Sequence, residues 1–158
     1  MATVTFSSVI ERPAEEIFDL LADIRRNPEW SPAFTGAEKL TAGPVGPDAM
    51  FRTSMRGLGE LEIRITRYER PRRIWFTTRA KAAEIRHNFV LMPGEGGTHV
   101  EQEIDVRPRG VLRVVAPVMA LMLRRSVQSN TAALKAYLER GANAGSGAPK
   151  AQHVETGA

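Results

Sequence analysis

Apolar and polar residues alternate along much of the chain between residues 3 and 107, with the period of two that is typical of β-strands. Seven stretches with this alternation are predicted to be strands: residues 3–10, 34–41, 50–56, 60–68, 72–79, 84–92 and 99–107. Turns rich in glycine and proline separate several of them, and residues 93–97 (Pro-Gly-Glu-Gly-Gly) are the clearest hairpin loop. Strands joined by such short turns predict an antiparallel sheet of six to seven strands.

Two segments have the helical period of 3.6 instead. The first begins at Pro13, a residue type favoured in the first turn of a helix, and ends at Asn27 before Pro28. Its apolar face is formed by Ile17, Leu20, Leu21 and Ile24. Residues 27–32, which include Trp30, are predicted to form a turn or a second short helix.

The second helical segment is long and covers residues 110–140, with Gly141 as its expected end. Pro117 is expected to kink this helix or to break it after Ala116. The pattern therefore predicts an α+β fold with two short helices after the first strand and one long C-terminal helix, all on one face of the sheet. We expect one domain in residues 1–141 and a disordered tail, rich in Gly and Ala, in residues 142–158.

Composition narrows the classes of function. The 158 residues are enough for one domain with a sizeable core, and the absence of cysteine excludes disulfides, thiolate metal sites and a cysteine nucleophile. The first residues lack the basic and apolar regions of a signal peptide, and the longest apolar run, residues 111–123, is too short to span a bilayer. We therefore expect a cytoplasmic protein.

The chain carries a net charge of +4, and a run of arginines lies between residues 64 and 79. Such a run can bind an anionic partner, either nucleic acid or a lipid headgroup, or can form a solvated strand face with the glutamates around it. No helix-turn-helix, zinc-finger or RNA-recognition motif accompanies the charge, so we favour the solvated face and expect no nucleic-acid partner.

Five segments together are typical of one protein family: residues 9–23 (VIERPAEEIFDLLAD), 28–30 (PEW), 68–74 (YERPRRI), 96–100 (GGTHV) and 134–139 (LKAYLE). With them the chain resembles the START-like, helix-grip superfamily and, within it, the polyketide cyclase/dehydrase (SRPBCC) proteins, over residues 3–140. The resemblance implies a sheet curved around and gripping the last helix, with an internal cavity for an apolar or amphipathic small molecule. It implies no particular reaction.

Strand side chains alternate between two faces, so position along each strand predicts which residues point inward. Most inward positions are apolar, and Phe51, Phe76 and Phe89 are aromatic. Five polar residues share this face: Ser8, Thr53, Thr78, His87 and Gln102. Because a buried polar group without a partner is costly, they either contact a ligand or bond to one another, to the backbone or to water.

His87 is the candidate catalytic residue. It lies between Ile85 and Phe89 on the inward face, where a histidine can act as a general acid or base near neutral pH. It can equally donate a hydrogen bond to a ligand carbonyl, or be a structural histidine. The three histidines of the chain are too dispersed in sequence to predict a metal site, and we expect neither a metal nor a cofactor.

One face of the C-terminal helix is expected to complete the pocket. Its residues recur every three or four positions: Leu112, Val115, Met119, Met122, Ser126, Asn130, Ala133 and Tyr137. Methionine suits adaptable packing against ligands, and Ser126 and Asn130 are unusual for a solid core. Residues 111–123 are expected to form either a movable lid or a surface that contacts a membrane transiently.

The predicted ligand-binding residues are Trp30, Phe51, Thr53, Phe76, Thr78, His87, Phe89, Gln102, Met119, Met122, Ser126 and Asn130. Two functions are consistent with these residues. The first is binding of a small hydrophobic ligand such as a lipid, a quinone or a polyketide. The alternative is an enzyme of the polyketide cyclase/dehydrase type with His87 as acid or base. No nucleotide-binding loop, zinc-hydrolase motif or serine-hydrolase motif is present, so we favour binding.

Overall fold

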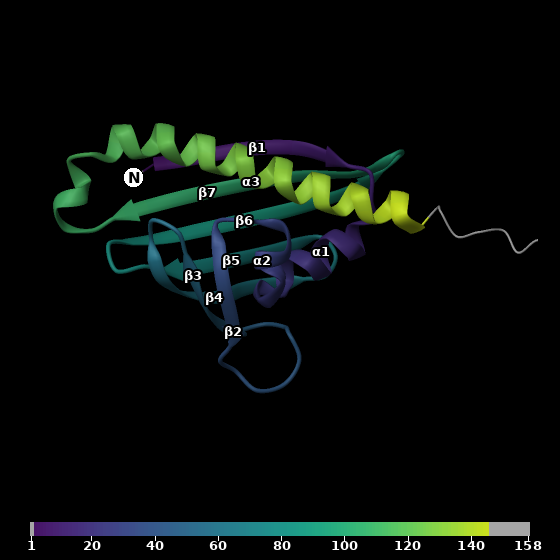
Figure 1. Ribbon diagram of the computed structural model, residues 1–158, viewed down its shortest axis with the longest axis horizontal. Coiled ribbons are helices and arrows are strands. Elements are labelled where there is room, and N and C mark those ends of the chain that lie inside the picture. The colour runs from purple at the N-terminus through teal and green to yellow at the C-terminus, as the bar shows by residue number, and fades with distance from the viewer. Residues whose placement is uncertain (1, 146–158) are drawn as a thin grey trace, which may run out of the picture.

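The computed structural model describes residues 2–145, with side chains for residues 3–141, and its main feature is one antiparallel sheet of seven strands (Figure 1). The strands are β1 (Ala2–Ile10), β2 (Phe34–Lys39), β3 (Met50–Met55), β4 (Gly59–Glu69), β5 (Arg73–Arg79), β6 (Ala83–Gly94) and β7 (Gly97–Pro108). They lie in the order β1-β7-β6-β5-β4-β3-β2. Strands adjacent in sequence from β2 to β7 are therefore also adjacent in the sheet, which confirms the predicted antiparallel arrangement.

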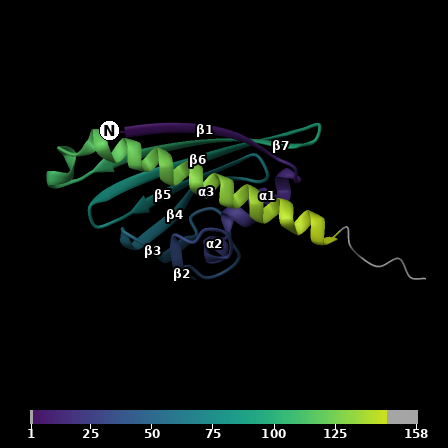
Figure 2. The same ribbon diagram turned by 45° about the horizontal axis from the view of Figure 1, so that its top comes forward.

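The helices lie on one side of this sheet. Helix α1 (Ala14–Ala22), the 3-10 helix η1 (Ile24–Arg26) and helix α2 (Asn27–Trp30) connect β1 to β2, which are at opposite edges of the sheet. The 3-10 helix η2 (Gly110–Arg113) precedes the long helix α3 (Ala116–Gly145). Figure 2 shows α3 lying across the curved sheet. The α+β fold class and the short helices after the first strand are thereby confirmed. No helix in residues 2–145 has the length and hydropathy needed to cross a membrane.

The pleat of the sheet sorts side chains as the alternation predicted. On β5, for example, Ile74, Phe76 and Thr78 are buried while the residues between them are more accessible. The main core cluster joins inward residues of the sheet to Phe18 of α1 and to Leu134 of α3. Burying these apolar surfaces is the dominant favourable contribution to folding, and it holds both helices against the sheet.

The long helix differs from its predicted bounds at both ends. It was expected to run from residue 110, but the α-helix begins at Ala116, so that Pro117 lies in its first turn, where the missing N–H of proline costs no hydrogen bond. It was expected to end at Gly141 but continues to Gly145. Gly141 does not adopt the positive φ with which glycine usually terminates a helix. Residues 146–158 of the expected tail lie outside the described residues.

The buried face of α3 is also rotated from the predicted one. Val127, Leu134 and Leu138 are buried against the sheet, whereas Ser126 is exposed at the side of the helix. Both sets of residues recur with helical spacing, so the periodicity alone did not distinguish them. The fold selects the face with the two leucines because it buries more apolar surface.

Candidate ligand-binding cavity

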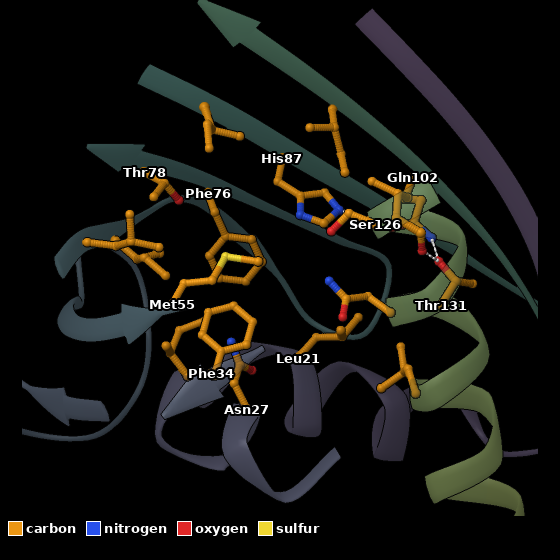
Figure 3. A pocket seen from close by; sticks show the side chains of 18 of the residues that line it. Leu21, Asn27, Phe34, Met55, Phe76, Thr78, His87, Gln102, Ser126 and Thr131 are labelled. Carbon is orange, nitrogen blue, oxygen red and sulfur yellow. Dashed lines mark hydrogen bonds between the residues drawn. The ribbon is translucent and has the colours of Figure 1, made fainter. Parts of the chain in front are cut away.

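A cavity of about 200 Å³ lies between the sheet and α3, with α1, η1 and α2 along one side (Figure 3). Its apolar walls are formed by Leu21, Ile24, Phe34, Met55, Leu58, Leu61, Ile63, Phe76, Ile85, Phe89, Ile104, Leu123, Val127 and Leu134. Its polar lining consists of Asn27, Thr78, His87, Gln102, Ser126, Asn130 and Thr131, and Trp30 adds its indole. Residues far apart in the chain therefore share one largely apolar cavity with a few polar groups, as is typical of small-molecule sites.

A chain of hydrogen bonds runs from the cavity wall to the backbone of α3. His87 Nε2 lies 3.1 Å from Gln102 Oε1, and the side-chain nitrogen of Gln102 donates to Thr131 Oγ1 at 2.5 Å. Thr131 Oγ1 in turn donates to the backbone carbonyl of Val127 at 2.8 Å. Figure 3 shows Gln102 and Thr131 joined across the sheet–helix interface, with His87 beside them. The chain thus couples β6 and β7 to α3.

The backbone carbonyl of Val127 sets the direction of every hydrogen bond in this chain. A carbonyl only accepts, so the Thr131 hydroxyl donates to it and accepts from the amide nitrogen of Gln102. The Gln102 carbonyl oxygen therefore faces His87 and accepts from Nε2–H. In a neutral imidazole with its proton on Nε2, Nδ1 carries a lone pair, and no hydrogen bond to it is found among the described residues. The wall of the cavity thus has a hydrogen-bond acceptor at His87.

Burial keeps His87 uncharged. Removal from water lowers the pKa of His87 to about 4, although the hydrogen bond with Gln102 acts in the opposite direction. The ring keeps some accessible surface because it borders the cavity, but protein atoms enclose it and it packs on Phe89 with ring centroids 4.1 Å apart. At neutral pH, His87 is therefore a neutral hydrogen-bonding group.

Further polar groups come from α2 and from the middle of α3. The hydroxyl of the fully buried Ser31 donates to the side-chain oxygen of Asn130 at 2.9 Å, which leaves the N–H groups of the Asn130 amide as donors. The indole nitrogen of Trp30 is buried and has no hydrogen-bond partner within residues 3–141. Asn27 is buried at the wall opposite the sheet (Figure 3). The Asn130 amide is therefore a donor on the helix side of the cavity, whereas the acceptor at His87 lies on the sheet.

Residues 1–139 match a protein family described as polyketide cyclase / dehydrase and lipid transport. The chain belongs to this family. The match covers nearly all of the described residues and confirms the family that the sequence resembles. No protein of curated function matches the sequence.

Solved structures similar to this family member share its fold at low sequence identity. A START superfamily protein from Mycobacterium smegmatis is 15% identical with a TM-score of 0.76, over 89% of this chain and 99% of that one. The di-domain ARO/CYC BexL from the BE-7585A biosynthetic pathway is 20% identical with a TM-score of 0.73, and 90% of this chain matches 48% of BexL. DynU16, from the dynemicin biosynthetic locus, is 17% identical with a TM-score of 0.67, and 89% of this chain matches 48% of it. These similarities support the START-like helix-grip fold.

The fold of this family brings most of the predicted ligand residues together. Trp30, Phe76, Thr78, His87, Phe89, Gln102, Ser126 and Asn130 all line the cavity. Met119 and Met122 line a second hollow of about 330 Å³ near the start of α3. The two hollows share Met55, Leu58, Ile85, Leu123 and Ser126, so they adjoin one another. Contact between these residues and a ligand stays a prediction.

Two predicted residues, Phe51 and Thr53, lie outside both hollows. They have the predicted inward orientation on β3 and are buried. Phe51 packs in the main core cluster, and the Thr53 hydroxyl donates to the backbone carbonyl of Gly36 on the neighbouring strand. Protein therefore fills the inward face of β3 at Phe51 and Thr53, whereas Met55 on the same face lines the cavity, and inward orientation alone could not reveal this difference.

The sequence interpretation missed several residues of the cavity, above all Thr131 and Asn27. Thr131 follows Val127 by four positions, and this spacing allows its hydroxyl to reach the carbonyl of the preceding turn. That signal is local and weak, because a threonine in a helix commonly makes such a bond. The side of the cavity formed by Leu21, Asn27 and Phe34 comes from helices and a strand whose placement depends on the tertiary fold.

Replacing Gln102 with leucine is expected to lower the free energy of unfolding by about 1–2 kcal/mol, because His87 and Thr131 both lose a buried partner. Gln128→Leu is the matched control, since Gln128 is exposed on the same helix as Thr131. Urea denaturation measures the stability, and the nitrogen NMR shifts of the His87 ring report its tautomer. Unchanged stability together with an unchanged tautomer would show that the hydrogen-bonded chain does not hold the histidine.

Proposed function

We propose that the protein binds an apolar or amphipathic small molecule in the cavity between the sheet and α3, and that the ligand donates a hydrogen bond to Nδ1 of His87. The proposal rests mainly on one observation: a neutral histidine lies in an otherwise apolar wall, and its Nε2–H already donates a hydrogen bond to Gln102. A ligand hydroxyl, such as a phenol, enol or alcohol, would complete the hydrogen bonding of the ring. Asn130 would contribute N–H donors to a ligand oxygen.

The lining supports binding over acid–base catalysis. Among the described residues that line the cavity, His87 is the only one with a titratable side chain, so no second acid or base faces it. A general base works best with a pKa near the working pH, and the pKa of His87 is about 4. A buried neutral imidazole is suited to recognition of a polar group inside an apolar site.

Catalysis of the polyketide cyclase type is the second candidate function. It is favoured by the family description and by the similarity of fold to the ARO/CYC protein BexL. In this reading, Nδ1 of His87 would accept a proton from a substrate held in the same cavity. The two candidates share a ligand of the same chemistry and differ in whether His87 accelerates a reaction.

A pair of aromatic probes tests the proposed hydrogen bond. We expect 1-naphthol to bind about fivefold more tightly than 1-methoxynaphthalene, which lacks the hydroxyl hydrogen, since one hydrogen bond contributes about 1 kcal/mol. His87→Phe should remove this preference while keeping the binding of the ether. His99→Phe is the control, because His99 is partly exposed on β7 outside the cavity lining. Fluorescence titration of both probes with the three proteins measures the dissociation constants.

The outcomes separate the alternatives. If neither probe binds the wild-type protein, ligand binding in this cavity is wrong. If both probes bind equally well to the wild type, the cavity binds ligands but His87 does not select a hydroxyl. For a cyclase substrate, a 10²–10⁴-fold loss of turnover in His87→Phe with unchanged affinity, on the order expected for loss of a general base, would favour the enzyme.

A further inference from the structure

The start of α3 and the segment before it have an unusual concentration of exposed apolar side chains. Six of the ten exposed large apolar residues of the described chain lie within residues 111–122: Val111, Val114, Val115, Val118, Leu121 and Met122. Val111 is 88% exposed and Val114 is 83% exposed. We call these six residues the apolar ridge. Contiguous exposed apolar surface of this kind marks interaction sites in soluble proteins.

The same segment is surrounded by positive charge. No aspartate or glutamate occurs between residues 106 and 138, whereas Arg113, Arg124 and Arg125 lie within or directly after the ridge. All three arginines are exposed, and none forms an ion pair with any other residue in the described part of the chain. By contrast, Arg107 and Arg109, which precede the ridge, pair with Asp105 and Glu84. The charge around the ridge is therefore not neutralised from within the protein.

The ridge adjoins the second hollow, which in turn adjoins the ligand cavity. Met122 belongs both to the ridge and to the second hollow, which adjoins the main cavity through Leu123 and Ser126. Figure 1 shows the segment between β7 and α3 projecting at one end of the molecule, beyond the end of the sheet. Val111, Val114 and Val115 belong to this projecting segment.

We propose that the apolar ridge docks on the surface of a lipid bilayer that contains anionic lipids. A helix with exposed Val, Leu and Met side chains and flanking arginines has the composition of segments that lie at the membrane interface, with apolar side chains at the acyl boundary and arginines at lipid phosphates or carboxylates. When the ridge is docked on the bilayer, the second hollow would lie next to the membrane surface. The inference goes beyond the proposed function, because it concerns a different surface and requires no ligand.

A second copy of this chain is a less suitable occupant. In a two-fold dimer formed through the ridge, Arg113, Arg124 and Arg125 of one copy would face the same residues of the other. Like charges brought together without acidic partners oppose association. An anionic bilayer instead complements both the apolar and the charged part of this surface.

Vesicle sedimentation with the ligand-free, full-length protein tests the proposal. We expect binding to vesicles of phosphatidylcholine that contain about one third phosphatidylserine, and at least tenfold weaker binding to pure phosphatidylcholine vesicles. Leu121→Asp should reduce binding to the anionic vesicles more than tenfold. Leu40→Asp is the matched control, because Leu40 is also exposed but lies outside the ridge, and it should bind as the wild type does.

Two double charge-reversal variants distinguish the effect of the arginines beside the ridge from the effect of the net charge of the protein. Arg124→Glu/Arg125→Glu should reduce vesicle binding more than tenfold. Lys135→Glu/Arg140→Glu changes the net charge by the same amount on the distant half of α3 and should reduce it much less. Circular dichroism checks that every variant stays folded, and raised salt should weaken wild-type binding.

Several results would overturn the membrane proposal. They are equal binding to anionic and neutral vesicles, no vesicle binding at all, or vesicle binding that Leu121→Asp leaves unchanged. Dimerisation of the wild type in analytical ultracentrifugation that Leu121→Asp abolishes, without vesicle binding, would assign the ridge to a second copy of the chain. None of these results depends on whether the naphthol probes bind, so failure of this inference is distinguishable from failure of the proposed function.

Discussion

Replacing Ser126 with phenylalanine is expected to weaken the binding of 1-naphthol by about 100-fold, with little change in the free energy of unfolding. Ser126 lines both hollows and is itself exposed at the side of α3, so a larger side chain meets the space where they join. A phenyl ring there would occupy volume that a ligand needs. In a solid core the same change would instead cost about 1–3 kcal/mol through overpacking. Fluorescence titration and urea denaturation measure the two quantities on the same samples.

Ser129→Phe is the control for this experiment. Ser129 lies on the same helix, is exposed, and is outside both cavity linings, so the variant adds the same ring to the solvent side. It should bind the probe as the wild-type protein does. Equal loss of binding in both variants would point to a general effect on α3. A large loss of stability in Ser126→Phe alone would show that the position is packed core and that the proposed cavity is wrong.

Acidification from pH 7 to pH 4 is expected to lower the free energy of unfolding through His87 by as much as about 3 kcal/mol. Burial lowers the pKa of His87 to about 4 in the folded protein, whereas the pKa of an exposed histidine is about 6.5. Between these values the unfolded chain binds a proton that the folded protein does not bind. Stability therefore falls as the pH falls through this window and changes no further through His87 below about pH 4.

His87→Gln isolates this contribution. Glutamine does not titrate and keeps an N–H donor for the side-chain oxygen of Gln102, so the variant should lose most of the pH dependence between pH 6.5 and pH 4. The pKa of Asp19 is lowered mainly by its hydrogen bond with Arg70, so Asp19 affects the pH dependence of stability only at lower pH. This effect should be the same in the wild type and in His87→Gln. Urea denaturation at a series of pH values gives the two curves. Parallel curves for the wild type and His87→Gln would show that His87 is not buried as a neutral group.

The sequence by itself determined the succession of strands and helices along the chain and the inward face of the sheet. Alternation with a period of two, interrupted by glycine and proline turns, is a local property, and each strand carries it whether or not the others are present. The inward orientation of Phe76, His87 and Gln102 followed from this alternation and is confirmed by the structure. The long helix was also visible in the sequence, because helical periodicity extends well past residue 116.

The tertiary structure decided which of these inward residues line a cavity and which fill the core. Phe51 and Phe76 are both phenylalanines at inward positions of predicted strands, but only Phe76 lines the cavity. The rotation of α3 about its axis was likewise undetermined, because two faces had helical spacing and the choice depended on the apolar area that each could bury against the sheet.

The protonation state of His87 also depended on the tertiary structure. Its tautomer follows from a hydrogen-bonded chain that links residues 87, 102, 127 and 131, and its low pKa follows from the protein atoms that displace water around the ring. Neither cause is local in sequence. Alternation could place a histidine on the inward face, but desolvation and hydrogen bonding are set by neighbours in space, and these exist only once α3 has packed against the sheet.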